Sequence, residues 1–329
     1  MEKQIIPLVF TIDDNYAKFL SITLTSILKY ASKDKFYKFY VFNPGLHCDS
    51  IENLNKFNTD ISSVEYVDVA LKAQTMVEDL PIRDYYSRAI YYRIFTQSLL
   101  PQYDKVLYMD SDIVVLDDIA KLYNTDIGDN LIGAVPDYAV SIIPEFILYV
   151  EEALDIEHSH YFNSGVMLMN LKKFRELDLE KQFIDTLNKF KFDVAPDQDC
   201  LNVLCKDKVY YLDTTWNKMP LGENYKPSLV HYNLTFKPWK YDNIMYEEYF
   251  WNLASEAGVL NDVKQIKESF TNAMAKRDLE GGELLKEKCV IQAHSYYNYR
   301  RITHRENSLV YDLYARVRIL IRKFTRKHA

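Results

Sequence analysis

The sequence predicts an α/β fold with a mostly parallel sheet, followed by a mainly helical C-terminal extension. The chain has 329 residues, of which 48% are hydrophobic, so it can bury a large core. Segments with strand and helix patterns alternate up to about residue 240, as they do in βαβ units. From about residue 241 onward the pattern is mainly helical.

Short apolar runs predict the strands, and runs with a period near 3.6 predict the helices. Strands are expected at residues 5–12, 37–42, 63–69, 104–110, 130–136, 164–171 and 208–213. Helices are expected at residues 17–31, 50–58, 88–100, 180–190 and 197–205. Inside the helical extension, the adjacent glycines 281 and 282 predict the clearest break.

Composition and charge indicate where the protein is located and which kinds of partner it could bind. No stretch reaches the roughly 18 apolar residues of a membrane-spanning helix, and the first residues do not form a secretory signal, so we expect a cytoplasmic protein. The four cysteines have no metal-ligand spacing and are expected to be buried free thiols. The net charge is −7, yet the last 15 residues hold six basic residues and no acid. An acidic body of this kind argues against a nucleic-acid partner.

Polar clusters follow the predicted strands at the edge where open parallel sheets bind ligands. They read "TIDDNY", "MDSD" and, at the start of a helix, "PDQD". The chain has only 8 glycines and neither of the glycine-rich phosphate-binding motifs, which argues against dinucleotide and P-loop binding. Asp110 and Asp112 share one face if the strand continues through them, and paired carboxylates are suited to a divalent cation.

Six motifs then occur in a characteristic order: "VFTIDDNY", "YYRI", "KVLYMDSDIVV", "YFNSGVMLMNLKKFR", "DQDCLN" and "HYNLTFKPW". With these motifs the sequence resembles the retaining glycosyltransferases of family 8, which include bacterial lipooligosaccharide galactosyltransferases and, more distantly, glycogenin. The resemblance covers roughly residues 4–240. It implies a single Rossmann-like nucleotide-sugar-binding domain of the GT-A type at 1–240. Beyond this domain, the sequence pattern itself predicts a helical extension at 241–308 and a basic amphipathic tail at 309–329.

The resemblance also implies a role for individual residues. Thr11, Asp13, Asn15 and Tyr16 would contact the uracil and ribose of a UDP-sugar, and Ser111 would also lie in the donor site. Asp110, Asp112 and His231 would hold Mn²⁺ (or Mg²⁺), and Lys237 would reach the diphosphate. Arg93, Asn163, Ser164, Asp197 and Gln198 would surround the transferred sugar. Gln198 would lie beneath the anomeric carbon, with Asp197 and Asp137 as further catalytic residues.

One position departs from the family pattern. The pattern reads HxxGxxKPW, and here Leu234 stands in place of the glycine whose backbone N–H approaches the diphosphate. A leucine there means either that a shifted backbone still donates this N–H or that the phosphate contact is weaker.

The expected function is therefore transfer of a hexose from UDP-galactose or UDP-glucose to a saccharide acceptor, free or lipid-linked. The family places Gln198 where a nucleophilic carboxylate would be expected, which favours a same-face route with retention. The basic tail is expected to attach the enzyme to an anionic membrane surface, on the inner face of the cytoplasmic membrane. Two alternatives are a haloacid-dehalogenase-like phosphatase that uses the DxD aspartates, and a catalytically inactive sugar-binding module.

Overall fold

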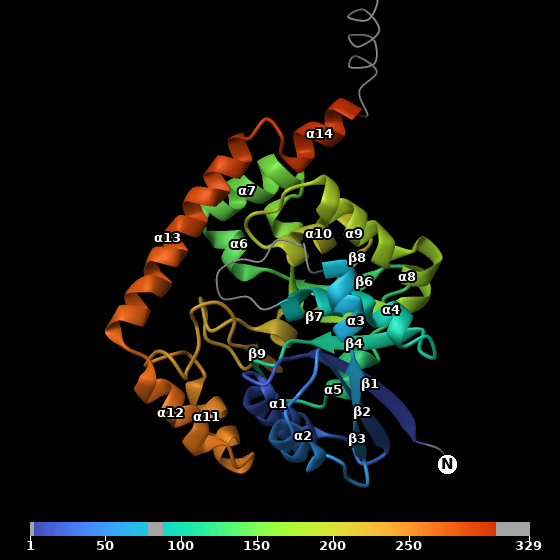
Figure 1. Ribbon diagram of the computed structural model, residues 1–329, viewed down its shortest axis with the longest axis vertical. Helices are drawn as coiled ribbons and strands as arrows, with labels where there is room; N and C mark the ends of the chain where they lie inside the picture. Colours follow the sequence, from blue (N-terminus) through green and yellow to red (C-terminus); the bar gives the residue numbers. More distant parts are fainter. Residues whose placement is uncertain (1–2, 78–87, 307–329) are drawn as a thin grey trace, which may run out of the picture.

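The computed structural model describes residues 3–77 and 88–306 of the chain (Figure 1). Within these residues a seven-stranded sheet forms the centre of the molecule. Its strands lie in the order β3 (Ser62–Asp68), β2 (Lys35–Asn43), β1 (Gln4–Thr11), β4 (Lys105–Met109), β7 (Phe162–Asn170), β6 (Ile132–Pro136) and β8 (Val209–Tyr211).

The first four strands of this order are parallel, and β7 runs antiparallel to both of its neighbours. The sheet is thus mixed but mainly parallel, which confirms the predicted α/β class. Because β7 is reversed, its first residues lie beside the carboxyl end of β4, where Met109 pairs with Val166. Two distant parts of the sequence therefore meet at the ligand-binding edge of the sheet.

Helices cover both faces of the sheet. One face packs against α1 (Ala17–Tyr30), α2 (Cys48–Asn55) and α5 (Ile119–Tyr123). The other face packs against a 3₁₀ segment, η2 (Arg88–Phe95), and against α4 (Thr96–Leu99), α7 (Pro144–Leu154), α8 (Leu171–Leu177), α9 (Leu179–Lys189) and α10 (Pro196–Leu204). Shorter elements complete this part of the chain: α3 (Ala70–Lys72), η1 (Ala73–Val77), α6 (Tyr138–Ile142), η3 (His158–His160) and η4 (Thr214–Asn217).

Most predicted strands and helices agree with the structure to within a few residues. The helix predicted at 88–100 is instead η2 followed by the short α4. The sequence analysis missed β5 (Ile113–Val115) and β9 (Leu229–His231), which pair with each other outside the main sheet. This small sheet positions His231 beside Ile113, directly after the DxD motif.

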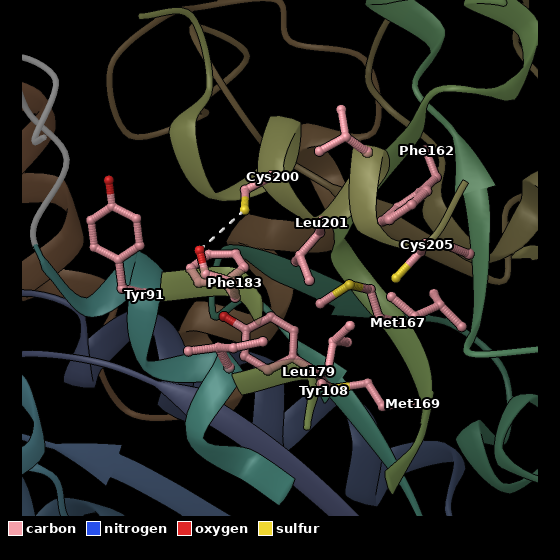
Figure 2. Packing of buried hydrophobic residues seen from close by; sticks show 14 of the residues in the cluster. Tyr91, Tyr108, Phe162, Met167, Met169, Leu179, Phe183, Cys200, Leu201 and Cys205 are labelled. Carbon is pink, nitrogen blue, oxygen red and sulfur yellow. Dashed lines mark hydrogen bonds between the residues drawn. The ribbon is translucent and has the colours of Figure 1, made fainter. Parts of the chain in front are cut away.

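The core between the sheet and α9 and α10 is tightly filled with sulfur-containing and aromatic side chains (Figure 2). Cys200 and Cys205 lie within it, and the Cys200 thiol points to the carbonyl oxygen of Phe183, 3.6 Å away. All four cysteines are free, as predicted, and three of them are buried. Cys48 is exposed, contrary to the prediction, because it begins helix α2 at the surface.

The C-terminal helices pack on two sides of this domain. Helices α11 (Glu247–Glu256) and α12 (Leu260–Ser269) cover the outer side of α1 and the small sheet. The Trp239 ring lies between Phe19 and Phe250, with ring centroids 4.3 and 5.0 Å away. Helix α13 (Asn272–His294) then runs along the side of the molecule to α7, and α14 (Tyr299–Glu306) follows it (Figure 1).

The predicted break at Gly281 and Gly282 is wrong, because both residues lie inside α13. The helix continues through them because its next turns are anchored by buried Leu285, Cys289 and Ala293. The predicted basic tail at 309–329 lies outside the described residues. Among the helices that the structure does describe, none has the length and apolar character needed to cross a membrane.

Candidate active site

A cavity of about 290 Å³ opens where the carboxyl ends of β1 and β4 meet the start of β7. Every residue that the sequence analysis assigned to donor, sugar or metal lines it. They are Thr11, Asp13, Asn15, Tyr16, Arg93, Asp110, Ser111, Asp112, Asp137, Asn163, Ser164, Asp197, Gln198, His231 and Lys237. Their common location is an observation, whereas the role of each remains a prediction.

Three of these side chains form a cluster that can hold a metal ion. Asp110, Asp112 and His231 each offer one ligand atom, and these atoms lie within 4.8 Å of one another. The Nε2 atom of His231 lies 3.6 Å from Asp110 Oδ2 and 3.3 Å from Asp112 Oδ1. Two carboxylate oxygens and one imidazole nitrogen form a donor set that fits a divalent cation.

The second oxygen of each carboxylate is held by the protein. Asp110 Oδ1 accepts hydrogen bonds from the Tyr108 hydroxyl at 2.8 Å and from Arg93 Nη2 at 3.3 Å. Asp112 Oδ2 accepts one from Lys237 Nζ at 2.6 Å. Each aspartate therefore turns its remaining oxygen toward His231, which orients the cluster before any cation binds.

The charges around Asp112 keep it ionised. Burial alone would raise its pKa, but the Lys237 ammonium and His231 more than offset this effect and hold the pKa of Asp112 well below its usual value. Lys237 also donates to the backbone oxygen of Tyr232, and its ammonium lies 5.0 Å from the centre of the Trp239 ring. These contacts fix the lysine at the wall of the cavity.

The DxD segment is not part of a strand, in contrast to the prediction. Strand β4 ends at Met109, and residues 110–112 form a short loop before β5. The Thr23 hydroxyl on α1 braces this loop, since it lies 2.9 Å from the Ser111 carbonyl oxygen and 2.8 Å from that of Ile113. The two carboxylates still face the same group because the loop, rather than strand alternation, orients them.

Gln198, in the first turn of α10, is held on both sides of its amide group. Its Oε1 accepts from the Ser164 backbone N–H at 2.9 Å and from the Ser164 hydroxyl at 3.3 Å. Its Nε2 donates to Asp137 Oδ2 at 3.2 Å. Asp137 in turn accepts from Asn163 Nδ2 at 2.9 Å and caps the start of α6 with its other oxygen. The amide is thus fixed in one orientation.

Arg93 connects the two halves of the cavity. Its Nη1 donates to the Ser164 carbonyl oxygen at 2.7 Å, and its Nε lies 3.5 Å from Asp197 Oδ2. Burial raises the pKa of Asp197, and the nearby Arg93 guanidinium opposes that rise. With its further contact to Asp110, this buried arginine balances two carboxylates, those of Asp110 and Asp197.

Leu234 retains the backbone conformation that a glycine would favour. Its φ is 51°, in the left-handed region, and the residue lines the cavity. Such a conformation costs a non-glycine residue about 1–2 kcal/mol. The loop between His231 and Lys237 therefore turns at Leu234 through a conformation that glycine adopts freely, although a leucine occupies the position.

Three residues near the site were missed by the sequence analysis. Gly165 packs closely against His231 and Asp110, Asn217 contacts the His231 ring, and Leu285 brings α13 to the cavity wall. Gly165 lies inside a quoted motif, but nothing in the sequence shows that His231 packs against it. Asn217 and Leu285 lie in segments that carry no recognisable motif.

Comparison with known proteins agrees with this geometry. The model of glycosyl transferase family 8 matches residues 7–243. General stress protein A of Bacillus subtilis is 28% identical over 260 residues, which covers 72% of this chain and 88% of that protein. Lipopolysaccharide 1,2-glucosyltransferase of Escherichia coli is 28% identical over 254 residues, which covers 70% of this chain and 71% of that enzyme.

Solved structures give the same result. The galactosyltransferase LgtC, solved with donor and acceptor sugar analogues, is 27% identical with a TM-score of 0.63. The match covers 76% of this chain and 96% of LgtC. The bifunctional glycosyltransferase WbbM has a TM-score of 0.71 at 23% identity, over 82% of this chain and 53% of WbbM, and supports the GT-A fold alone. Since the family model matches most of the sequence, this chain belongs to glycosyl transferase family 8 and is a hexosyltransferase.

Proposed function

We propose that this chain is a retaining, metal-dependent enzyme that transfers galactose or glucose from a UDP-sugar to a hydroxyl group of a saccharide acceptor. The observation that carries the proposal is the joint location of two groups in one cavity. The cation cluster of Asp110, Asp112 and His231 lies on one side, and the fixed amide of Gln198 lies on the other. Arg93 contacts both sides, so the two parts are held at a set separation.

Asp110, Asp112 and His231 would hold the cation, and an imidazole beside two carboxylates favours Mn²⁺ over Mg²⁺. When bound there, the cation supplies positive charge next to the diphosphate of the donor. Lys237 adds a second positive charge beside Asp112, at a distance of 2.6 Å. The Lys237 ammonium would stabilise the diphosphate more strongly once the sugar begins to leave, because negative charge then grows on the diphosphate.

The other residues bind the donor. Thr11, Asp13, Asn15 and Tyr16 line the part of the cavity next to β1 and the start of α1, and we assign them to the uracil and ribose. Ser111 lies between the two metal-binding aspartates and lines the same wall. The loop at Leu234 supports this arrangement, since its left-handed backbone turns the chain between His231 and Lys237.

The reaction exchanges one bond at the anomeric carbon for another. The bond from this carbon to the diphosphate oxygen breaks, and its electron pair stays with UDP. The acceptor hydroxyl oxygen then bonds to the same face of the carbon, and its proton passes to the departing phosphate. Gln198 contributes an oriented amide dipole rather than a nucleophile, because its oxygen accepts from Ser164 and its nitrogen donates to Asp137. Retention of configuration follows from attack on the same face.

The donor sugar is galactose or glucose, which differ only in configuration at C4. Asp137, Asn163 and Asp197 line the sugar side of the cavity and would distinguish the two through hydrogen bonds to the hydroxyl groups. A role in cell-surface glycan or lipid-linked oligosaccharide synthesis is supported by the name of the Escherichia coli relative, a lipopolysaccharide glucosyltransferase.

The test of this function is UDP release from UDP-galactose and UDP-glucose, with Mn²⁺ or with EDTA. We expect slow hydrolysis of one donor by the wild type, and loss of that activity in EDTA and in Asp112→Asn. Asp129→Asn is the matched control, because Asp129 is 98% exposed and lies outside the cavity. Hydrolysis that persists in EDTA or in Asp112→Asn would contradict the proposal, and absence of hydrolysis with either donor and an acceptor would indicate a binding module.

We also propose attachment to the inner face of the cytoplasmic membrane through the basic tail, residues 309–329. Its apolar and basic residues alternate at helical spacing, a pattern suited to an anionic lipid surface. Deletion of residues 309–329 should release the enzyme from sedimented membranes and leave donor hydrolysis in solution intact. Unchanged recovery with the membranes would contradict this part of the proposal.

A further inference from the structure

His231 presents two different ring nitrogens to its surroundings. Nε2 faces the two carboxylates of the cation cluster, and Nδ1 lies 3.0 Å from the side-chain oxygen of Asn217. A histidine binds a cation only through a ring nitrogen without a proton, and the hydrogen bond at the other nitrogen decides which one that is. The orientation of the Asn217 amide therefore matters for the cluster.

Two buried asparagines fix that orientation. The backbone N–H of Gly165 donates to Asn163 Oδ1 at 3.0 Å, and Asn163 Nδ2 donates to Asp137 Oδ2 at 2.9 Å. Because a backbone N–H can only donate and a carboxylate can only accept, the Asn163 amide has one allowed orientation. Its oxygen also accepts from Asn217 Nδ2 at 3.0 Å, so Asn217 must turn its own oxygen to His231.

We propose that Asn217 is the positioning residue that keeps the proton of His231 on Nδ1 and leaves Nε2 free for the cation. Without this acceptor, the carboxylates 3.3 and 3.6 Å from Nε2 would draw the proton to that nitrogen and remove the ligand. The inference deepens the proposed function, because it concerns how the same site is prepared for its metal.

Burial and backbone contacts support this role. Asn217, Asn163 and His231 are 5%, 7% and 2% exposed, so water has little access to the hydrogen bonds between them. The backbone next to Asn217 is tied to β9, since Lys218 N–H donates to the Leu229 oxygen and His231 N–H donates to the Lys218 oxygen. These backbone hydrogen bonds hold Asn217 beside the His231 ring.

The same chain of hydrogen bonds reaches the reaction centre. Asn163 shares Asp137 Oδ2 with Gln198, so the path runs from His231 through Asn217, Asn163 and Asp137 to the amide of Gln198. Occupation of the cation cluster would thereby stabilise the orientation of Gln198. A loss of Asn217 should affect both the cation affinity and the turnover with saturating cation.

The first test uses the metal-free wild-type protein. Its histidine ring ¹⁵N shifts report which nitrogen carries the proton, and the His231→Gln variant identifies the signals of His231 among the seven histidines. At a pH where the ring is neutral, we expect the proton on Nδ1. A neutral His231 with the proton on Nε2 would overturn the inference, whether or not any cation binds, and so separates it from the proposed function.

The second test measures Mn²⁺ affinity by electron paramagnetic resonance in Asn217→Leu and Asn217→Asp. Leucine is close to asparagine in size but makes no side-chain hydrogen bond. The Mn²⁺ affinity of Asn217→Leu should therefore fall about 10–100-fold, as it does when other hydrogen-bond partners of ligating histidines are removed. Asn217→Asp keeps an acceptor for Nδ1–H but cannot donate to Asn163 Oδ1, so it should restore only part of the affinity. Asn298→Leu is the matched control, because Asn298 is equally buried but lies between α13 and α14.

Each outcome decides the matter. Unchanged Mn²⁺ affinity in a folded Asn217→Leu protein would overturn the inference, as would a loss of equal size in Asn217→Asp. If Asn217→Leu does not fold, the ring spectrum of the wild type and the affinity of Asn217→Asp still give the answer. If the wild type binds no Mn²⁺ at all, the proposed metal fails, while the spectrum still tests the position of the proton.

Discussion

Gly165 provides the space that His231 needs to reach the carboxylates. A Cβ atom at this position would lie 2.2 Å from Cε1 of His231 and 2.8 Å from Oδ2 of Asp110. The strand cannot move away easily, because its carbonyl oxygen accepts from the Asp110 N–H at 2.8 Å. One missing side chain thus allows three distant segments to meet.

The Gly165→Ala variant should therefore lose cation affinity. Displacement of His231 by the new methyl group removes one ligand, and overpacking of this kind typically costs about 1–3 kcal/mol of stability. Mn²⁺ titration and urea denaturation measure the two effects. Gly282→Ala is the matched control for Mn²⁺ affinity, since no atom lies within 4 Å of its added Cβ. Equal Mn²⁺ affinity in Gly165→Ala and wild type would show that His231 is not a ligand.

Asp199, which follows Gln198 in α10, has an unusual environment. It is fully buried and accepts hydrogen bonds from the hydroxyls of Tyr149 at 2.8 Å and Tyr161 at 2.6 Å. Burial raises its pKa from 3.8 to about 7, although these hydrogen bonds oppose the rise. The folded protein therefore holds a proton at Asp199 in a pH range where the unfolded chain has lost it.

This difference predicts how stability depends on pH. The contribution of Asp199 is fully present below its unfolded pKa of 3.8 and is lost as the pH rises toward 7, at about 1.4 kcal/mol per pKa unit. An amide cannot ionise, so Asp199→Asn should gain stability relative to wild type between about pH 5 and pH 8. Urea denaturation of both proteins at these two pH values measures the change. Parallel pH dependence of the two proteins would contradict it.

At the residue scale, the sequence predicts those site residues that belong to recognisable motifs. Asp110 and Asp112 stand out as paired acids after an apolar run, and the "DQD" and "KPW" segments locate Gln198 and Lys237. Asn217 has no such signal, because its importance depends on the position of its amide between His231 and Asn163 in space. Hydrogen bonds between side chains far apart in sequence leave no local pattern.

At the scale of the elements, α13 contains two consecutive glycines, a residue type that weakens helices. Gly281 and Gly282 lie near its middle, with open space where each Cβ would be. Glycine in a helix interior costs about 1 kcal/mol relative to alanine because its unfolded backbone is more flexible.

Replacing both glycines by alanine should therefore stabilise the protein by roughly 2 kcal/mol. The two glycines precede the cavity-lining Leu285 by about one helical turn, so UDP release by the double variant is measured as well. It should equal that of the wild type. Thermal unfolding measures the stability. A lower unfolding temperature would indicate that α13 needs its glycines, for example to bend.

Most long elements were predictable, with the 11-residue α7 as an exception, and very short ones were not. β1, β2 and α1 have eight or more residues with clear apolar patterns, whereas β5 and β9 have three residues each. Three residues are too few to show an alternation. The reversed direction of β7 was also not predictable, because its apolar run reads the same in either direction.

At the scale of the whole molecule, the C-terminal helices stabilise the catalytic domain from outside. The α11–α12 pair packs on α1 and the small sheet that carries His231. Helix α13 connects to this region through an ion pair of Asp278 with Lys240 at 2.9 Å, and it contributes Leu285 to the cavity wall. The boundary near residue 240 remains a prediction, but the helices beyond it clearly contact elements that position the site.

The central claim is that one cavity holds a cation-binding half and a reaction half. Calorimetry of UDP binding with Mn²⁺, combined with donor hydrolysis, tests it most directly in Asp112→Asn and Gln198→Ala, with the exposed Gln182→Ala as control. We predict that Asp112→Asn loses roughly tenfold or more in Mn²⁺-dependent UDP affinity. Gln198→Ala should keep that affinity and lose roughly 100-fold in hydrolysis. Loss of UDP affinity in Gln198→Ala, or unchanged affinity in Asp112→Asn, would contradict the account.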